Sequence, residues 1–161
     1  MSKNHWLLFG TCALSLFGVG QVWLVQLSSY PLWSYVGPQE FKIYHLIWWH
    51  SIWGPILGPA TLVFIGALLM LRWPPAGIPT WLVWLGLALQ LALILGSALW
   101  WGPLMARIEA PDGGLLPHRY QLLMTTHWLR VAIVTAYGSV ACWMLARSSW
   151  DRPQNGQGVA Y

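Results

Sequence analysis

The residues of this chain that could do chemistry are a few histidines and one arginine within long apolar runs. His127 and Arg130 are three residues apart in the run from about Tyr120 to Leu145, so a helix would place them on one face. A neutral imidazole can accept a proton from a weak acid, and a guanidinium can stabilise the oxyanion that forms. His45, near the start of another run, could also serve as the base. His45, His127 and Arg130 are therefore the candidate catalytic residues.

Further polar and aromatic side chains could bind a substrate beside these groups. One lies at i+7 from Arg130 on the same expected helix face, one lies near the end of the first apolar run, and three lie near the start of the second. Together with the histidines and Arg130 they would form a polar pocket in an apolar protein. The candidate substrate-binding residues are Tyr44, Gln26, His50, Trp49 and Tyr137.

Arg130 is the most informative of these residues, because an arginine at the centre of a membrane helix costs about 2.5–3.5 kcal/mol. We expect its guanidinium to face the protein interior. The apolar runs contain no Asp or Glu, so its partners should be carbonyl groups, Gln, Tyr, His or a bound anionic ligand. The alternative is a structural arginine, bound to carbonyls that Pro55 and Pro59 release in the kinked segment "GPILGP". In the same segment Gly54 and Gly58 would allow close helix packing.

Other kinds of site find less support. His45 and His50 are five residues apart, about 140° around a helix, and no carboxylate accompanies them, so we expect no metal site. A bis-histidine haem, with His45 and His127 as ligands from two helices, remains open as a cofactor. Phosphate-binding loops and dinucleotide fingerprints are absent from the sequence.

The composition predicts that lipid surrounds the chain. Of its 161 residues 57% are hydrophobic and only 7% are charged, whereas soluble domains carry roughly 25% charged residues. The net charge of +4 comes from eight scattered basic residues against four acidic ones, so nucleic acid is not an expected partner. The expected partners are the lipid bilayer, a lipophilic small molecule and, in one interpretation, other subunits of a membrane complex.

Four runs are long enough to cross a bilayer, which takes about 20 helical residues. They cover about residues 6–26, 44–71, 80–101 and 120–145. Because backbone groups in lipid must bond to one another, such runs form helices. The sequence therefore predicts an all-α fold, an integral membrane four-helix bundle over residues 1–146, with residues 147–161 as a polar, flexible tail. The segment "SSYPLWSYVGPQEF" is expected to be an interfacial loop.

The distribution of Lys and Arg gives a weak prediction of orientation. One side would carry four of them (Lys3, Arg72, Arg147 and Arg152) and the other three (Lys42, Arg107 and Arg119). The side richer in basic residues is usually cytoplasmic. We therefore expect both termini in the cytoplasm of a multi-pass protein in the bacterial inner membrane or another bacterial membrane.

Two stretches carry a resemblance to a known family. They are "VWLVQLSSYPLWSYVGPQEFKIYHLIWWH", followed by the Gly-Pro-rich helix, and "TTHWLRVAIVTAYG". Over roughly residues 20–140 the chain resembles small bacterial four-helix membrane proteins related to the anthrone-oxygenase-like family. Where an Asn is expected in the last motif, this chain has His127. The resemblance implies cofactor-free oxygenation of an activated aromatic ring.

Three functional interpretations follow from these observations. The chain could be an oxidoreductase that acts on a small lipophilic aromatic or quinone-like substrate, with His45 or His127 as base and Arg130 as oxyanion partner. It could instead be a non-enzymatic accessory or assembly subunit of a larger membrane complex. The third interpretation is a haem-binding redox protein.

Overall fold

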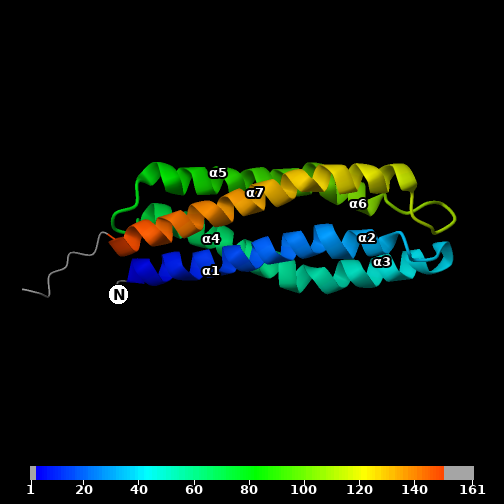
Figure 1. Ribbon diagram of the computed structural model, residues 1–161, viewed down its shortest axis with the longest axis horizontal. Helices are drawn as coiled ribbons and strands as arrows, with labels where there is room; N and C mark the ends of the chain where they lie inside the picture. Colours follow the sequence, from blue (N-terminus) through cyan, green and yellow to red (C-terminus); the bar gives the residue numbers. More distant parts are fainter. Residues whose placement is uncertain (1–2, 151–161) are drawn as a thin grey trace, which may run out of the picture.

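The computed structural model describes residues 3–150, and these residues form helices and no strands. The prediction of an all-α fold is thereby confirmed. Four long helices account for nearly all of the described chain (Figure 1). The first comprises α1 (Lys3–Leu24), the π-helical segment η1 (Val25–Ser29) and α2 (Tyr30–Trp33); the second comprises α3 (Pro38–Ile52), η2 (Trp53–Leu57) and α4 (Gly58–Arg72). The third comprises α5 (Thr80–Gly96), η3 (Ser97–Trp101) and α6 (Gly102–Ala106), and the fourth is α7 (Pro117–Trp150).

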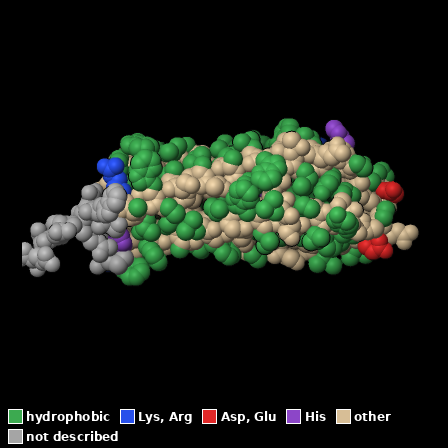
Figure 2. All heavy atoms as spheres, in the orientation of Figure 1, with side chains coloured by type: hydrophobic (Ala, Val, Ile, Leu, Met, Phe, Trp, Pro, Cys, Tyr) green, Lys and Arg blue, Asp and Glu red, His purple; other side chains and the backbone are tan. Residues whose placement is uncertain are grey.

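All four long helices are long and apolar enough to cross a membrane. The segments with that property are Lys3–Trp33, Pro38–Arg72, Thr80–Ala106 and Pro117–Ser148, with 27 to 35 residues each. They contain the expected runs and extend them at most ends. Figure 2 shows hydrophobic side chains along the visible flank, with Lys, Arg, Asp and Glu gathered near the two ends. This distribution is consistent with a multi-pass membrane protein.

Each π-helical segment ends two residues before a proline. One residue separates η1, η2 and η3 from Pro31, Pro59 and Pro103, respectively. A proline lacks the backbone N–H, and its ring clashes with the carbonyl four residues earlier. Widening the preceding turn relieves that clash, so these helices continue past prolines that would otherwise end or kink them.

The first of these turns makes the predicted interfacial loop largely wrong. The chain remains helical through η1 and α2, and only residues 34–37 lie between α2 and α3. The second helix then begins at Pro38, earlier than expected, with Gly37 extended at φ −61° and ψ 152° before it. Proline is favoured at this first helical position, because its missing N–H would have no partner there anyway.

The helices pack in a closed order. Helix α1 contacts α4 and α7, and α5 contacts the same two helices. The close approaches lie at Gly66, where an added Cβ would meet Thr11 Oγ1, and at Gly138, where it would meet Val19 Cγ2. The expectation that Gly54 and Gly58 provide close packing is wrong. No atom of another segment lies within 4 Å of a Cβ at either position.

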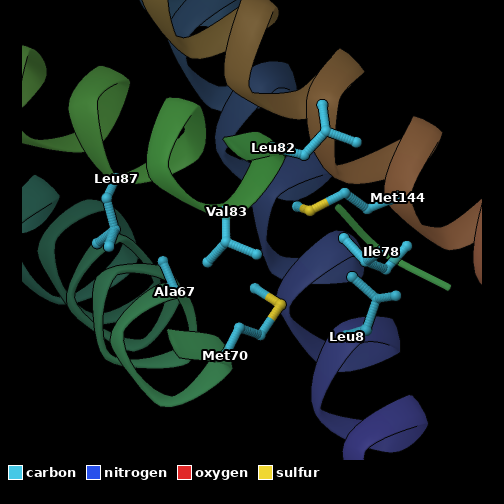
Figure 3. Packing of buried hydrophobic residues seen from close by; sticks show 8 residues of the cluster. All are labelled: Leu8, Ala67, Met70, Ile78, Leu82, Val83, Leu87 and Met144. Atoms are coloured by element: carbon cyan, nitrogen blue, oxygen red, sulfur yellow. The ribbon is translucent and has the colours of Figure 1, made fainter. Parts of the chain in front are cut away.

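Two hydrophobic clusters lie at opposite ends of the molecule. The first, cluster 1, draws side chains from all four helices and from the loop before α5, near the end that holds residue 3 (Figure 3). The second, cluster 2, is largely aromatic and lies near the α2–α3 turn and the loop before α7. The members of cluster 1 are Leu8, Ala67, Met70, Ile78, Leu82, Val83, Leu87 and Met144. The buried members of cluster 2 are Tyr30, Trp33, Phe41, Trp101, Met105, Ile108 and Leu123.

The predicted tail is partly helical. Helix α7 continues through residues 147–150, and residues 151–161 lie outside the described residues.

Substitution of Gly66 tests the packing of α1 against α4. In Gly66→Ala the new Cβ would lie within 3.3 Å of Thr11 Cβ, and Thr11 Oγ1 is already committed to the Leu7 carbonyl. We expect the melting temperature in detergent to fall by about 3–10 °C. The matched control is Gly20→Ala, an exposed position in α1 with free space around it. That variant should keep or raise the melting temperature, because alanine is the better helix former. Equal shifts in both variants would contradict this packing.

Candidate functional site

A cavity of about 580 Å³ lies between the two hydrophobic clusters. All four long helices contribute to its wall, and most of the lining side chains are apolar. Cavities of this size hold small organic ligands, and a few polar groups in such a wall usually fix the ligand's orientation.

Helix α7 supplies a row of polar groups along this cavity. His127, Arg130 and Tyr137 all line it, together with Val134. The helix contains no proline after Pro117, so the i, i+3 and i+7 spacing keeps the row on one face. At 1.5 Å per residue, the row extends about 15 Å from His127 to Tyr137.

His127 is held in one orientation. Its side chain is 1% exposed, and Nδ1 lies 2.8 Å from Gln26 Oε1. Gln26 Nε2 donates to the Met124 carbonyl at 3.3 Å, which leaves Oε1 as the atom facing the imidazole. Because Oε1 can only accept, His127 Nδ1 carries the proton and Nε2 keeps its lone pair. The ring of Tyr30 packs against the imidazole in an edge-on arrangement at 4.8 Å.

Arg130 is supported by the third helix. Its Nη2 donates to Ser97 Oγ at 3.1 Å, and the guanidinium carbon lies 4.6 Å from the centre of the Trp101 ring. Trp101 is 2% exposed and fits against Gly96, where any Cβ would meet the indole at 2.5 Å. The Nε atom of Arg130 is buried and finds no hydrogen-bond partner among residues 3–150. No carboxylate forms an ion pair with Arg130 in this part of the chain.

Tyr137 ends the row with a second free donor. Its side chain is 2% exposed, and within the described residues the hydroxyl has no hydrogen-bond partner. Nearby, the amide of Gln90 also lines the cavity. Gln21 Nε2 donates to the Pro55 carbonyl at 2.8 Å, so one carbonyl of the Gly-Pro segment is an acceptor for another helix, as its prolines predict.

His45 lies outside the cavity. Its Nδ1 is 2.9 Å from Glu109 Oε1, and its ring stacks on Phe41 at 5.7 Å and packs edge-on against Trp33 at 5.2 Å. Glu109 lies in the loop before α7, in a turn that includes Gly113 at φ +90°. Sequence spacing gave no sign of this contact, because a loop 64 residues away delivers the carboxylate.

Of the five residues expected to bind substrate, the structure places two in the cavity wall and three outside it. Trp49 and Tyr137 line the cavity, and Gln26 lies behind His127. Tyr44 packs against cluster 2 and does not line the cavity. His50 is exposed, and its Nδ1 contacts the Leu46 carbonyl in its own helix.

Several cavity residues were missed by sequence reasoning. Ser97 and Gln90 line the cavity, and Trp101 lies behind its wall against the Arg130 guanidinium. Nothing in their spacing distinguishes these three from ordinary residues of an apolar run. The usable signal was the intramembrane polar character of Gln90 and Ser97.

The histidines do not fit a bis-histidine haem. The ring of Tyr30 contacts His127, Trp33 contacts Tyr30 at 4.8 Å, and His45 contacts Trp33 at 5.2 Å, while only His127 of the two histidines lines the cavity. The two imidazoles therefore do not face a common space. Among residues 3–150, no group of three or more His, Cys, Asp or Glu side chains gathers that could hold a metal ion.

No protein-family model, no curated protein and no solved structure matches the chain.

Proposed function

We propose that the protein is an integral membrane four-helix bundle whose cavity binds a small lipophilic, aromatic or quinone-like molecule and oxidises it without a cofactor. The observation that carries the proposal is that two residues of the cavity wall, Arg130 and Tyr137, each carry a hydrogen-bond donor that residues 3–150 do not satisfy, Arg130 Nε and the Tyr137 hydroxyl. Both are buried without a protein partner among the described residues. Buried donors in native proteins nearly always have partners, so an acceptor oxygen on a ligand is the natural candidate.

The aromatic rings and the single positive charge in the cavity wall indicate the chemical class of the ligand. Rings of Trp48, Trp49 and Phe64 line the wall, which suits a flat hydrophobic molecule. Arg130 brings a positive charge and has no carboxylate partner in this part of the chain. A carbonyl or phenolate oxygen on an aromatic ring satisfies both requirements.

The row on α7 supplies the groups that proton abstraction needs. His127 Nε2 has a lone pair and can take a proton from an acidic C–H or O–H of the bound ring. Negative charge then develops on the ring oxygen. Arg130 stabilises that charge in a site that apolar side chains keep dry, where the interaction is stronger than in water. The Tyr137 hydroxyl donates a hydrogen bond to an oxygen at the other end of the bound molecule.

The oxidant in this proposal is dioxygen. After His127 has accepted the proton, the carbanion transfers an electron to dioxygen, and the two radicals recombine to a peroxide anion at the same carbon. The protonated His127 returns its proton to this anion, which gives the hydroperoxide. Loss of water from the hydroperoxide forms the carbonyl. The net conversion is CH2 plus O2 to C=O plus H2O, which balances without a cofactor. The resemblance to the anthrone-oxygenase-like family points to the same chemistry.

The proposed membrane placement follows from the ends of the molecule. Lys3, Arg72 and Arg147 belong to the end at which α1 begins and α7 finishes. Arg152, which lies outside the described residues, follows in the sequence and gives this side four basic residues against three. We assign that end to the cytoplasm of a bacterial inner membrane.

Turnover of anthrone tests the two catalytic roles. We expect the protein in vesicles to convert anthrone to anthraquinone above the rate of protein-free vesicles, with one O2 consumed per product. His127→Ala and Arg130→Gln should each lower this rate by about 100-fold, because one loses the base and the other the oxyanion partner. The measurements are O2 uptake and product absorbance.

The control is His118→Ala, which removes an exposed histidine from the same helix and should leave the rate unchanged. Wild-type turnover that persists in folded His127→Ala and Arg130→Gln would overturn the proposal. Absence of any turnover in the wild type would count against oxygenation of this substrate class.

The Gln26–His127 contact makes a separate prediction about the tautomer. Nitrogen-15 NMR of the wild type should show His127 protonated at Nδ1. In Gln26→Leu the acceptor is lost, so we expect a shift toward the Nε2-protonated tautomer and a fall in anthrone turnover of about tenfold or more. Gln121→Leu, an exposed glutamine on α7, is the control for the spectrum. An unchanged His127 spectrum in Gln26→Leu would refute this role of Gln26.

A further inference from the structure

The wall of the cavity is not equally closed on all sides. Every lining residue of the first helix and of α7 is buried or half-buried. The lining residues that are exposed all come from the second and third helices. They are Trp53, Leu57 and Thr61 on one side and Ile94 and Ala98 on the other.

The path of the second helix explains this opening. Helices α4 and α5 contact each other, whereas Figure 1 shows α3 and α6 on opposite sides of the molecule. The two long helices therefore diverge from their contact toward the α3 and α6 ends. Cluster 1 closes one end of the resulting space, and the aromatic rings of cluster 2 close the other.

The opening in the cavity wall lies near the middle of the second and third long helices. Leu57 is 15 residues from Arg72 and 19 from Pro38, the two ends of its membrane-length segment, which corresponds to about 22 and 28 Å of helix. The hydrocarbon core of a bilayer is about 30 Å thick. A gap at this position faces acyl chains rather than water or headgroups.

We propose that the ligand enters sideways from the hydrocarbon core, between Trp53 and Leu57 on one side and Ile94 and Ala98 on the other. Its ring lies beside Arg130, and an alkyl or isoprenoid tail remains in the gap. This inference rests on the proposed function and names the substrate class more narrowly, as a membrane-dissolved ring compound with a tail. The polar row lies on the opposite wall, on α7, so the ring oxygen enters first and the tail follows.

A matched pair of quinones tests the role of the gap. The probes are 2-methyl-1,4-naphthoquinone, which has no tail, and its 3-phytyl derivative. Binding to the protein in lipid nanodiscs is followed by saturable quenching of tryptophan fluorescence, with the Arg130→Gln variant as the reference for non-specific quenching by quinone in the lipid.

Ala98→Phe places a ring in the gap. We expect it to raise the dissociation constant of the phytyl compound about tenfold more than that of the tailless compound, because the tail loses its space. Ala92→Phe is the matched control, since Ala92 is exposed on the same helix and does not line the cavity. It should leave the ratio of the two constants unchanged.

The outcomes separate the two proposals. If both quinones bind in an Arg130-dependent way but Ala98→Phe does not change the ratio of their constants, lateral entry is overturned and the ring-binding cavity stands. If neither quinone binds saturably, or if Arg130→Gln binds as well as the wild type, ring binding fails and lateral entry fails with it.

Discussion

A guanidinium among apolar helices must find its partners inside the protein. Arg130 finds them on the third helix, at the wall of the cavity. The third helix contributes the Ser97 hydroxyl and the face of Trp101, and neither neutralises the charge. The Nε atom is left with no acceptor among the described residues. A positive charge supported by hydrogen bonding and an aromatic ring, without a carboxylate, favours the binding of an electron-rich oxygen.

The prolines make room for this arrangement. Each π-helical segment widens a helix and ends directly before an X-Pro pair, and parts of all three segments line the cavity. Helix α7, which has no proline beyond its first residue, remains regular and holds the polar row of His127, Arg130 and Tyr137 in register. A π-turn inserted into a helix often marks a functional site, because it shifts side chains out of their regular positions.

The sequence predicted the helices and the polar row well, because both depend on local pattern. Apolar runs without Asp or Glu must be helical in lipid, and the spacing of His127, Arg130 and Tyr137 puts them on one helix face without reference to any other element. The contacts between helices could not be predicted from local sequence pattern. The pairing of Gln26 with His127 and of Glu109 with His45 depends on helix rotation and loop path. The X-Pro step alone could not predict the extended first helix, because the first helix continues through Tyr30-Pro31 whereas the second ends just before Trp73-Pro74.

The most direct test of this account is a crystal structure of the protein with 2-bromoanthraquinone, in which anomalous scattering locates the bromine. The account predicts a ring in the cavity with a carbonyl oxygen within about 3.2 Å of an Arg130 nitrogen. It would be contradicted by a ring bound elsewhere on the protein, or by an Arg130 side chain that points into lipid in the same crystal.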